Sequence, residues 1–215
     1  MASGKNQCAG AFGGVYDYYI ERPLLARVVG RAIWGIDPTG MYASMSAIAH
    51  APRGSTILDV PCGGGVALRA LAADQDVRYL ALDLSPDMLS RVRAKAAKRG
   101  LRQVETMQAD MRALPLADAS VDLLCSYSGL HMIPDARPAI AEFVRVLKPG
   151  GELIGSVFVA SGSRRMRTLF KAGQRRGYAM PPPDPLTIKR WLTDAGLVAA
   201  EVSDGGFVLF RARRP

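Results

Sequence analysis

The sequence predicts an α/β fold: a seven-stranded, mostly parallel sheet with helices on both faces and a C-terminal antiparallel hairpin. Between residues 55 and 160, short apolar segments alternate with segments of helical period, which is typical of βαβ units. The apolar segments are nearly continuous, as expected for strands that are covered on both faces. Near the end, two apolar segments flank Asp204-Gly205-Gly206, and strands joined so tightly must be antiparallel.

The boundaries of the expected elements follow from apolar spacing and from turn residues. Ser85 is a candidate N-cap, Pro86 suits the first helical position, and Gly100 suits the end of that helix. The expected strands lie at 56–60, 77–84, 104–110, 121–127 and 152–160, with the hairpin within 197–214. The expected helices lie within 15–40 and 41–50, and at 66–74, 86–100, 136–148 and 185–196, with Pro149-Gly150-Gly151 stopping the helix that begins at 136.

Composition favours one globular domain in a reducing compartment. A chain of 215 residues is long enough for one sizeable core and short for two. Its three cysteines are odd in number and widely spaced, which argues against a disulfide framework or a zinc site. The N-terminus shows no signal-peptide pattern, and no apolar stretch reaches the roughly 18 residues of a membrane span. We therefore expect a cytoplasmic protein.

The net charge of +9 is unusual for such a chain. It permits attraction to nucleic acid, anionic lipid or an acidic substrate, and a solvated basic surface explains it equally well. Several of the basic residues gather in one segment, 164–190. They are Arg164, Arg165, Arg167, Lys171, Arg175, Arg176, Lys189 and Arg190.

A glycine turn after the first strand predicts a nucleotide site. The segment Asp59–Gly65, "DVPCGGG", continues a strand into a helix, and ligands bind open α/β sheets at such strand ends. A dinucleotide pattern needs a small residue where Leu68 stands, and the lysine of an ATP-binding P-loop is absent. Asp83 and Asp110 end the next two strands. Carboxylates suit ribose hydroxyls and an adenine amino group, so we expect an adenosine-bearing ligand.

These motifs together resemble the class I S-adenosylmethionine-dependent methyltransferases, particularly the small single-domain type related to quinone-biosynthesis C-methyltransferases. The resemblance covers residues 55–160, and the terminal hairpin more loosely. The segments that carry it are "ILDVPCGGG", "ALDLSPDML", "QADMRALPLADASVDLLCSYSGLHMIPD" and "FVRVLKPGGELIGSVF". It implies a Rossmann-like fold, S-adenosylmethionine as cofactor and S-adenosylhomocysteine as product.

The resemblance also implies roles for the acids and their neighbours. Asp83 would bind the ribose hydroxyls, and Asp110 with the Met111 backbone would contact the adenine edge. Leu84 and Met88 would pack on the adenine. The alternative is that the two acids cap the segments that follow them and that Met88 belongs to the core.

The glycine loop would hold the methionine part of the cofactor. Asp59 would lie near its amino group, directly or through water. Pro61 stands where the family usually has a glycine, and it is compatible there if its φ is negative and no N–H is needed. The other expected lining residues are Cys62, which also suits packing, Gly63, Gly65 and Ser126.

The acceptor site is expected beyond the fourth strand. Methyl transfer is an in-line displacement that needs positioning and exclusion of water, with a base only where the nucleophile must lose a proton. His131 is the candidate base or substrate contact, with a structural loop histidine as the alternative, and Tyr127 is a second catalytic candidate. Tyr16 and Tyr19 could bind the acceptor or could fix a terminal helix to the domain.

We expect methyl transfer to a small molecule, by O- or C-methylation, in a monomer or homodimer. An RNA methyltransferase that uses the basic surface and a non-catalytic cofactor-binding module are the alternatives. The chain has no appended RNA-binding module, and Ser126–Gly129, "SYSG", replaces the Asp/Asn-Pro-Pro-aromatic run of enzymes that methylate exocyclic base nitrogens. The expected division is a helical cover (15–52), a cofactor-binding core (55–160), a candidate substrate lid (160–186) and a terminal helix and hairpin (186–213).

Overall fold

The computed structural model describes most of the chain. The residues described are 20, 22–34, 37–159, 168, 171, 175, 183–204 and 207–215, and for 33, 34, 199–204 and 207 the description covers the backbone alone. The candidate lid therefore lies outside the described residues apart from 168, 171, 175 and 183–186. Tyr16 and Tyr19 lie outside them as well.

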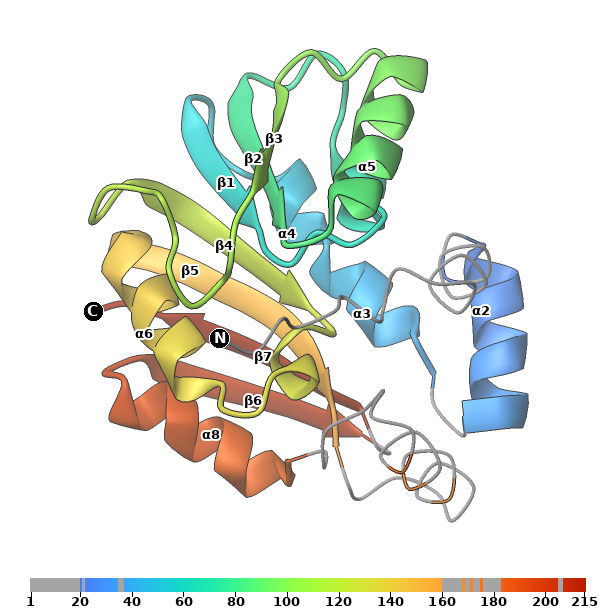
Figure 1. Cartoon of the computed structure of the whole chain (residues 1–215), viewed down its shortest axis with the longest axis vertical. Helices are drawn as coiled ribbons and strands as arrows, with labels where there is room; N and C mark the ends of the chain where they lie inside the picture. The colour runs from blue at the N-terminus through green and yellow to red at the C-terminus, as the bar shows by residue number, and fades with distance from the viewer. Residues whose placement is uncertain are drawn as a thin grey trace.

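The described strands form one seven-stranded sheet in the order β3-β2-β1-β4-β5-β7-β6 (Figure 1). The first five strands of the chain run parallel, and β7 is antiparallel to both β5 and β6. The predicted fold class and the terminal hairpin are confirmed. The strands are β1 (Ser55–Asp59), β2 (Val77–Asp83), β3 (Val104–Gln108), β4 (Val121–Tyr127), β5 (Leu147–Phe158), β6 (Val198–Asp204) and β7 (Phe207–Arg213).

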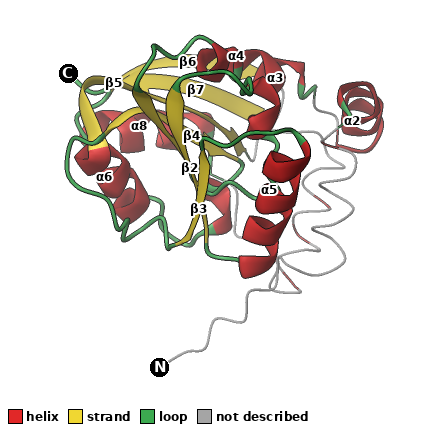
Figure 2. Cartoon of the chain, turned by 90° about the horizontal axis from the view of Figure 1, so that it is seen from above, coloured by secondary structure: helices red, strands yellow, loops and turns green. Residues whose placement is uncertain are grey.

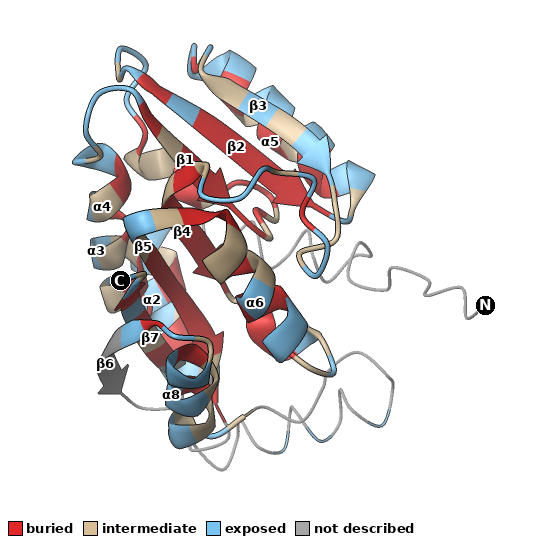
Figure 3. Ribbon diagram, turned by 90° about the vertical axis from the view of Figure 1, so that its left-hand side faces the viewer, coloured by how far each residue is buried: buried red, intermediate tan, exposed pale blue. Residues whose placement is uncertain are grey.

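Helices cover both faces of this sheet (Figure 2). One hydrophobic cluster joins one face of the strands to α3, α4 and α5, and a second joins the opposite face to α6 and α8. Strands β1, β2, β4 and β5 are largely buried, whereas β3 at the edge of the sheet has no buried residue (Figure 3). The helices are α2 (Pro23–Val29), η2 (Gly30–Trp34), α3 (Thr39–Ser44), α4 (Ser46–Ala49), η3 (Ala67–Ala70), α5 (Pro86–Lys98), η4 (Leu130–Met132), α6 (Arg137–Val146) and α8 (Pro185–Asp194).

The expected helix at 66–74 is wrong. The chain forms only the short 3₁₀ helix η3, and Leu71 is already extended. Arg99 at the end of α5 donates to the carbonyls of Leu68 and Leu71, and Gln103 donates to that of Ala72 at 2.6 Å. These carbonyls are satisfied by distant side chains, so the segment does not need a longer helix to satisfy them.

The helix that was expected to continue as far as Pro149 ends slightly earlier. Helix α6 ends at Val146, and Leu147–Gly151 already belongs to β5. Pro149 disfavours helical conformation at Lys148, and it has no N–H to donate. Leu147 is therefore extended, with φ −65° and ψ 138°, and pairs with Val121 of β4.

The expected caps of α5 are confirmed. The Ser85 side chain accepts a hydrogen bond from the Met88 N–H, Pro86 occupies the first turn, and Gly100 takes a positive φ of 66°. Among the described residues, no helix combines the length and apolarity that crossing a membrane requires.

Candidate active site

The switch point of the sheet lies at β1, which pairs with β2 on one side and β4 on the other. Asp59 ends β1 and Asp83 ends β2. Because Asp59 pairs with Ala81, Asp83 stands two residues further along the same face. The structure thus brings two of the three expected acids to one edge of the sheet, where open α/β folds bind ligands.

The glycine loop joins these two strand ends. The Gly63 N–H donates to Asp83 Oδ2 at 2.9 Å, and the Cys62 N–H donates to the Leu82 carbonyl at 2.8 Å. Gly63 has φ +48°, and a Cβ there would meet no atom within 4 Å, so its backbone faces open space. Gly65 has φ +82°, and a Cβ there would lie 3.1 Å from Leu68. Gly65 therefore serves packing, whereas Gly63 leaves room for a ligand.

Asp83 is a fixed acceptor beside this opening. Its carboxylate is 9% exposed, and Oδ1 accepts from the Ser85 N–H at 2.9 Å while Oδ2 accepts from Gly63. Burial raises the pKa of Asp83, although these backbone N–H groups oppose the shift. Each oxygen keeps a further lone pair for another donor. The adjacent Leu84 is 46% exposed and Met88 is buried at 9%, so an apolar side chain flanks the acceptor.

Pro61 packs against the loop that follows β4. It follows a cis peptide bond, and a Cβ on Gly129 would lie 2.6 Å from Pro61 Cγ and 3.6 Å from Met111 Cε. The φ of Pro61 is not positive, as its ring requires, and its place in the cofactor site stays a prediction. Cys62 supplies the N–H of this turn; its thiol is buried, which raises its pKa and leaves it neutral.

We predict that Gly129→Ala displaces the Pro61 turn. The added methyl overlaps the proline ring, so we expect a loss of about 1–3 kcal/mol in the free energy of unfolding, measured by denaturant titration. Adding Pro61→Gly should recover part of that loss, because the overlapping ring is then gone. Unchanged stability in Gly129→Ala would contradict this contact.

Asp110 is engaged with its neighbour in the sequence. Arg112 Nη2 donates to Asp110 Oδ2 at 2.6 Å, and this hydrogen bond holds the pKa of Asp110 below its usual range. The carboxylate is 32% exposed. Its expected contact with an adenine edge stays a prediction, as does that of the Met111 backbone. Gln108 connects β3 to the same region by donating to the Leu84 carbonyl at 3.0 Å.

Asp59 is 1% exposed, and its partner was missed by the sequence analysis. The Tyr79 hydroxyl on β2 donates to Asp59 Oδ2 at 2.9 Å. Burial raises the pKa of Asp59 to about 7, with Asp83 adding to the shift and Tyr79 opposing it. The signal was present, because a tyrosine within the buried strand "VRYLALD" needs a partner for its hydroxyl.

The candidate acceptor residues lie at the ends of β4 and β5. The Tyr127 hydroxyl is 3.1 Å from Ser44 Oγ of α3, and burial raises the Tyr127 pKa. His131 in η4 is 6% exposed and contacts the Phe158 ring edge to face, with centroids 5.0 Å apart. Burial lowers the pKa of His131 to about 4, so its imidazole is neutral at neutral pH. The Tyr127 hydroxyl is therefore hydrogen-bonded to the N-terminal helices, whereas the His131 ring is buried and neutral.

Serine hydroxyls are buried at the same strand ends. Ser126 and Ser156 are fully buried. The Oγ atoms of Ser126, Ser128 and Ser156 have no hydrogen-bond partner among the described residues. The Ser128 N–H donates to the Ser156 carbonyl at 2.8 Å, which holds the β4 and β5 ends together. Ser126 thus lies near the expected site, and its contact with the cofactor stays a prediction.

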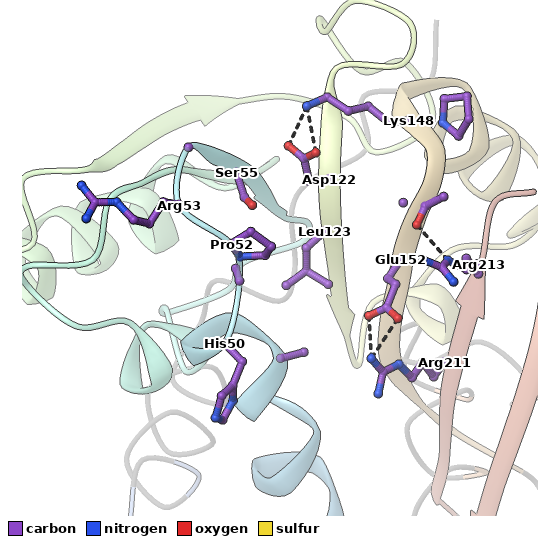
Figure 4. A pocket seen from close by; sticks show the side chains of 16 residues that line it. His50, Pro52, Arg53, Ser55, Asp122, Leu123, Lys148, Glu152, Arg211 and Arg213 are labelled. Atoms are coloured by element: carbon purple, nitrogen blue, oxygen red, sulfur yellow. Dashed lines mark hydrogen bonds and ion pairs between the residues drawn. The ribbon is translucent and has the colours of Figure 1, made fainter.

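A separate hollow of about 610 Å³ lies at the other end of the sheet, where β1, β4 and β5 begin (Figure 4). Its acids are paired with its bases: Lys148 Nζ lies 2.8 Å from Asp122 Oδ2, and Arg211 Nη2 lies 2.7 Å from Glu152 Oε2. His50, which lines it, contacts the Ser46 carbonyl. None of the expected site residues lies here, and these ion pairs connect strand ends to one another.

The basic segment is described in part. Lys171, Arg175, Lys189 and Arg190 are exposed, and its other members lie outside the described residues. Within the described part of the chain, no group of three His, Cys, Asp or Glu side chains could hold a metal ion.

Residues 57–151 match the family model described as "Methyltransferase domain". An uncharacterized protein of Mycobacterium tuberculosis, Rv1405c, is 34% identical over 135 residues, which are 57% of this chain and 47% of that protein. The demethylmenaquinone methyltransferase of Renibacterium salmoninarum is 33% identical over 126 residues, covering 59% of this chain and 50% of that enzyme. The chain thus spans about half the length of these curated relatives.

A solved structure shares the fold. A SAM-dependent methyltransferase from Aquifex aeolicus superposes with a TM-score of 0.63 at 21% identity, over 87% of this chain and 93% of that one.

Proposed function

We propose that the chain is a class I S-adenosylmethionine-dependent methyltransferase that transfers a methyl group to a small-molecule acceptor, by O- or C-methylation. The observation that supports this most is the fixed Asp83 carboxylate beside the open Gly63 backbone. A nucleoside needs such a pair: an acceptor for ribose hydroxyls and a surface without a side chain in the way.

The residues present fit the cofactor. Asp83 has spare lone pairs for the two ribose hydroxyls, and the exposed Leu84 offers an apolar surface for the adenine beside Met88. Asp110 and the Met111 backbone would contact the adenine edge once the side chain of Asp110 is shared with or released from Arg112. When bound, the cofactor supplies a methyl group on a positively charged sulfur.

The glycine loop and β1 would hold the methionine end. Asp59 would attract its ammonium group, because a buried carboxylate favours a nearby cation. Pro61 and Gly65 shape the turn through their packing, and buried Cys62 and Ser126 complete the wall with neutral side chains.

His131 would contact the acceptor. Its neutral imidazole can accept a hydrogen bond or a proton, and a pKa of about 4 makes it a weak base. Tyr127 would support this region through its hydrogen bond to Ser44 rather than by contact with the acceptor. The protein would then accelerate methyl transfer mainly by positioning the acceptor and excluding water.

Two measurements test the proposal. Isothermal titration with S-adenosylmethionine and S-adenosylhomocysteine should show binding of both. Transfer of labelled methyl from S-adenosylmethionine should then place label in a low-molecular-mass extract of cells and not in total RNA. Label in RNA would contradict the small-molecule acceptor, binding without transfer would indicate a binding module, and no binding would contradict the proposal as a whole.

We predict that His131→Ala lowers kcat on the identified acceptor by about 10²-fold and leaves the Kd of S-adenosylhomocysteine unchanged. His50→Ala is the matched control, because His50 is exposed and lines the hollow at the other end of the sheet. Equal kcat values in His131→Ala and the wild type would remove His131 from the acceptor site.

A further inference from the structure

Tyr79 lies in the core and yet reaches the candidate cofactor site. It is fully buried in β2, opposite Ile57 of β1. Its side chain extends diagonally past that pair, and its hydroxyl donates to Asp59 Oδ2 at 2.9 Å. Aromatic side chains are long enough for such diagonal contacts between neighbouring strands.

Among the described residues, Tyr79 is the side chain that donates a hydrogen bond to the Asp59 carboxyl. That carboxyl is 1% exposed, and a buried carboxylate without a donor is costly. A phenol that donates to the charged form stabilises the anion and fixes the oxygen to which it is bonded.

We propose that Tyr79 is a positioning residue for the cofactor: its hydroxyl stabilises the charged form of Asp59 and orients it towards the ammonium group of the bound methionine moiety. The inference rests on the proposed function, which assigns that ammonium group to Asp59.

The groups around Asp59 oppose its negative charge, so the charged form depends on the hydrogen bond from the Tyr79 hydroxyl. Asp83, on the same face of β2, repels the anion, and burial acts in the same direction. The ionisable groups that interact with Asp59 or Tyr79 are Asp83 of β2, Cys125 of β4 and Cys62 of the glycine loop. Lys95 of α5 interacts with Cys62 rather than with this pair. Burial raises the pKa values of both thiols, so they are neutral, and the Lys95 ammonium donates to the Gly64 carbonyl.

The direction of the pH effect follows from these contacts. The pKa of Asp59 is about 7, with the Tyr79 hydroxyl lowering it. Removing the hydroxyl raises that pKa, so at pH 7 more of the protein carries a neutral Asp59 and loses its attraction for the ammonium group. At a pH well above the Asp59 pKa of both proteins, Asp59 is charged in the wild type and in the variant without the hydroxyl. Their affinities for the cofactor should then become equal.

The test is the pH dependence of S-adenosylhomocysteine binding, measured by isothermal titration of the full chain between pH 5.5 and 8.5. In Tyr79→Phe we expect S-adenosylhomocysteine to bind about fivefold more weakly at pH 7 and about tenfold more weakly at pH 5.5. The difference should narrow towards pH 8.5, and the affinity should level off at a pH about one unit higher than in the wild type. Asp59→Asn should bind weakly with a flat profile over this range. Tyr42→Phe is the matched control, because it loses a hydroxyl that donates to the Ile20 carbonyl and should keep the wild-type profile.

Two results would overturn the proposal. The first is that the affinity of Tyr79→Phe for S-adenosylhomocysteine levels off at the same pH as that of the wild type. The second is that the variant loses the same factor in affinity at every pH, which would indicate a structural role alone. Thermal unfolding of each variant separates misfolding from these outcomes. If the wild-type protein itself fails to bind S-adenosylhomocysteine, the proposed function fails.

Discussion

Replacing Asp83 with alanine will weaken S-adenosylmethionine binding by about 1.5–3 kcal/mol, or roughly ten- to a hundredfold. The reason is the position of this carboxylate at the end of β2, where Gly63 and Ser85 fix its two oxygens at 2.9 Å from their backbone nitrogens. The side chain would therefore bind the ribose without further loss of conformational freedom. Isothermal titration of the two proteins measures the difference.

Asp87→Ala is the control for this experiment. Asp87 lies four residues later, in the first turn of α5, and it is exposed, so its removal changes the net charge equally. We expect the Kd of S-adenosylmethionine for Asp87→Ala to equal that for the wild type. Asp83→Asn keeps the size of the side chain and should lie between wild type and Asp83→Ala. Equal affinities for all four proteins would contradict the ribose assignment.

Replacing Gly155 with alanine will destabilise the sheet strongly. Gly155 pairs with Ser126 of β4 and Phe210 of β7. A Cβ there would overlap the Ser126 carbonyl oxygen and lie 2.5 Å from Phe210 Cζ. The oxygen belongs to the backbone of the neighbouring strand, so it cannot move aside without disturbing that strand. Overpacking usually lowers the free energy of unfolding by about 1–3 kcal/mol, and we expect a decrease near or above the upper end of that range in Gly155→Ala. Denaturant unfolding measures it.

Gly54→Ala provides the comparison. Gly54 has φ +76°, and a Cβ there would meet no atom within 4 Å, so only backbone strain of about 1–2 kcal/mol is expected. A smaller loss in Gly155→Ala than in Gly54→Ala would show that β4 and β5 are less closely packed than the structure has them.

The sheet was predictable because its signals are local. Alternating apolar and helical segments fix the strands, and the spacing of the last two requires a hairpin. The error at residues 66–74 arose from distant contacts. Arg99 donates to carbonyls about thirty residues earlier in the chain, and no local pattern around residues 66–74 indicates that. The end of α6, by contrast, was predicted from Pro149, whose effect on Lys148 is local, and the helix stops slightly earlier, at Val146.

The candidate site was predictable in part. Acids at the carboxyl ends of neighbouring parallel strands must meet at one edge, and Asp59 and Asp83 do so. Which partner each side chain takes depends on packing. Tyr127 bonds to Ser44, which is 83 positions earlier, and the sequence contains no signal for that pair. Tyr79 was missed because its strand was treated as uniformly apolar, although its hydroxyl required a partner.

We propose that the carboxyl ends of β1, β2 and β3 form one cradle for an adenosine. A crystal structure of the protein with S-adenosylhomocysteine is the direct test. We expect ribose hydroxyls within about 2.5–3.0 Å of the Asp83 oxygens. We also expect the adenine beside Leu84 and the ammonium group on the side of Asp59. An adenosine bound elsewhere, such as in the hollow lined by Lys148 and Arg211, would contradict the proposal.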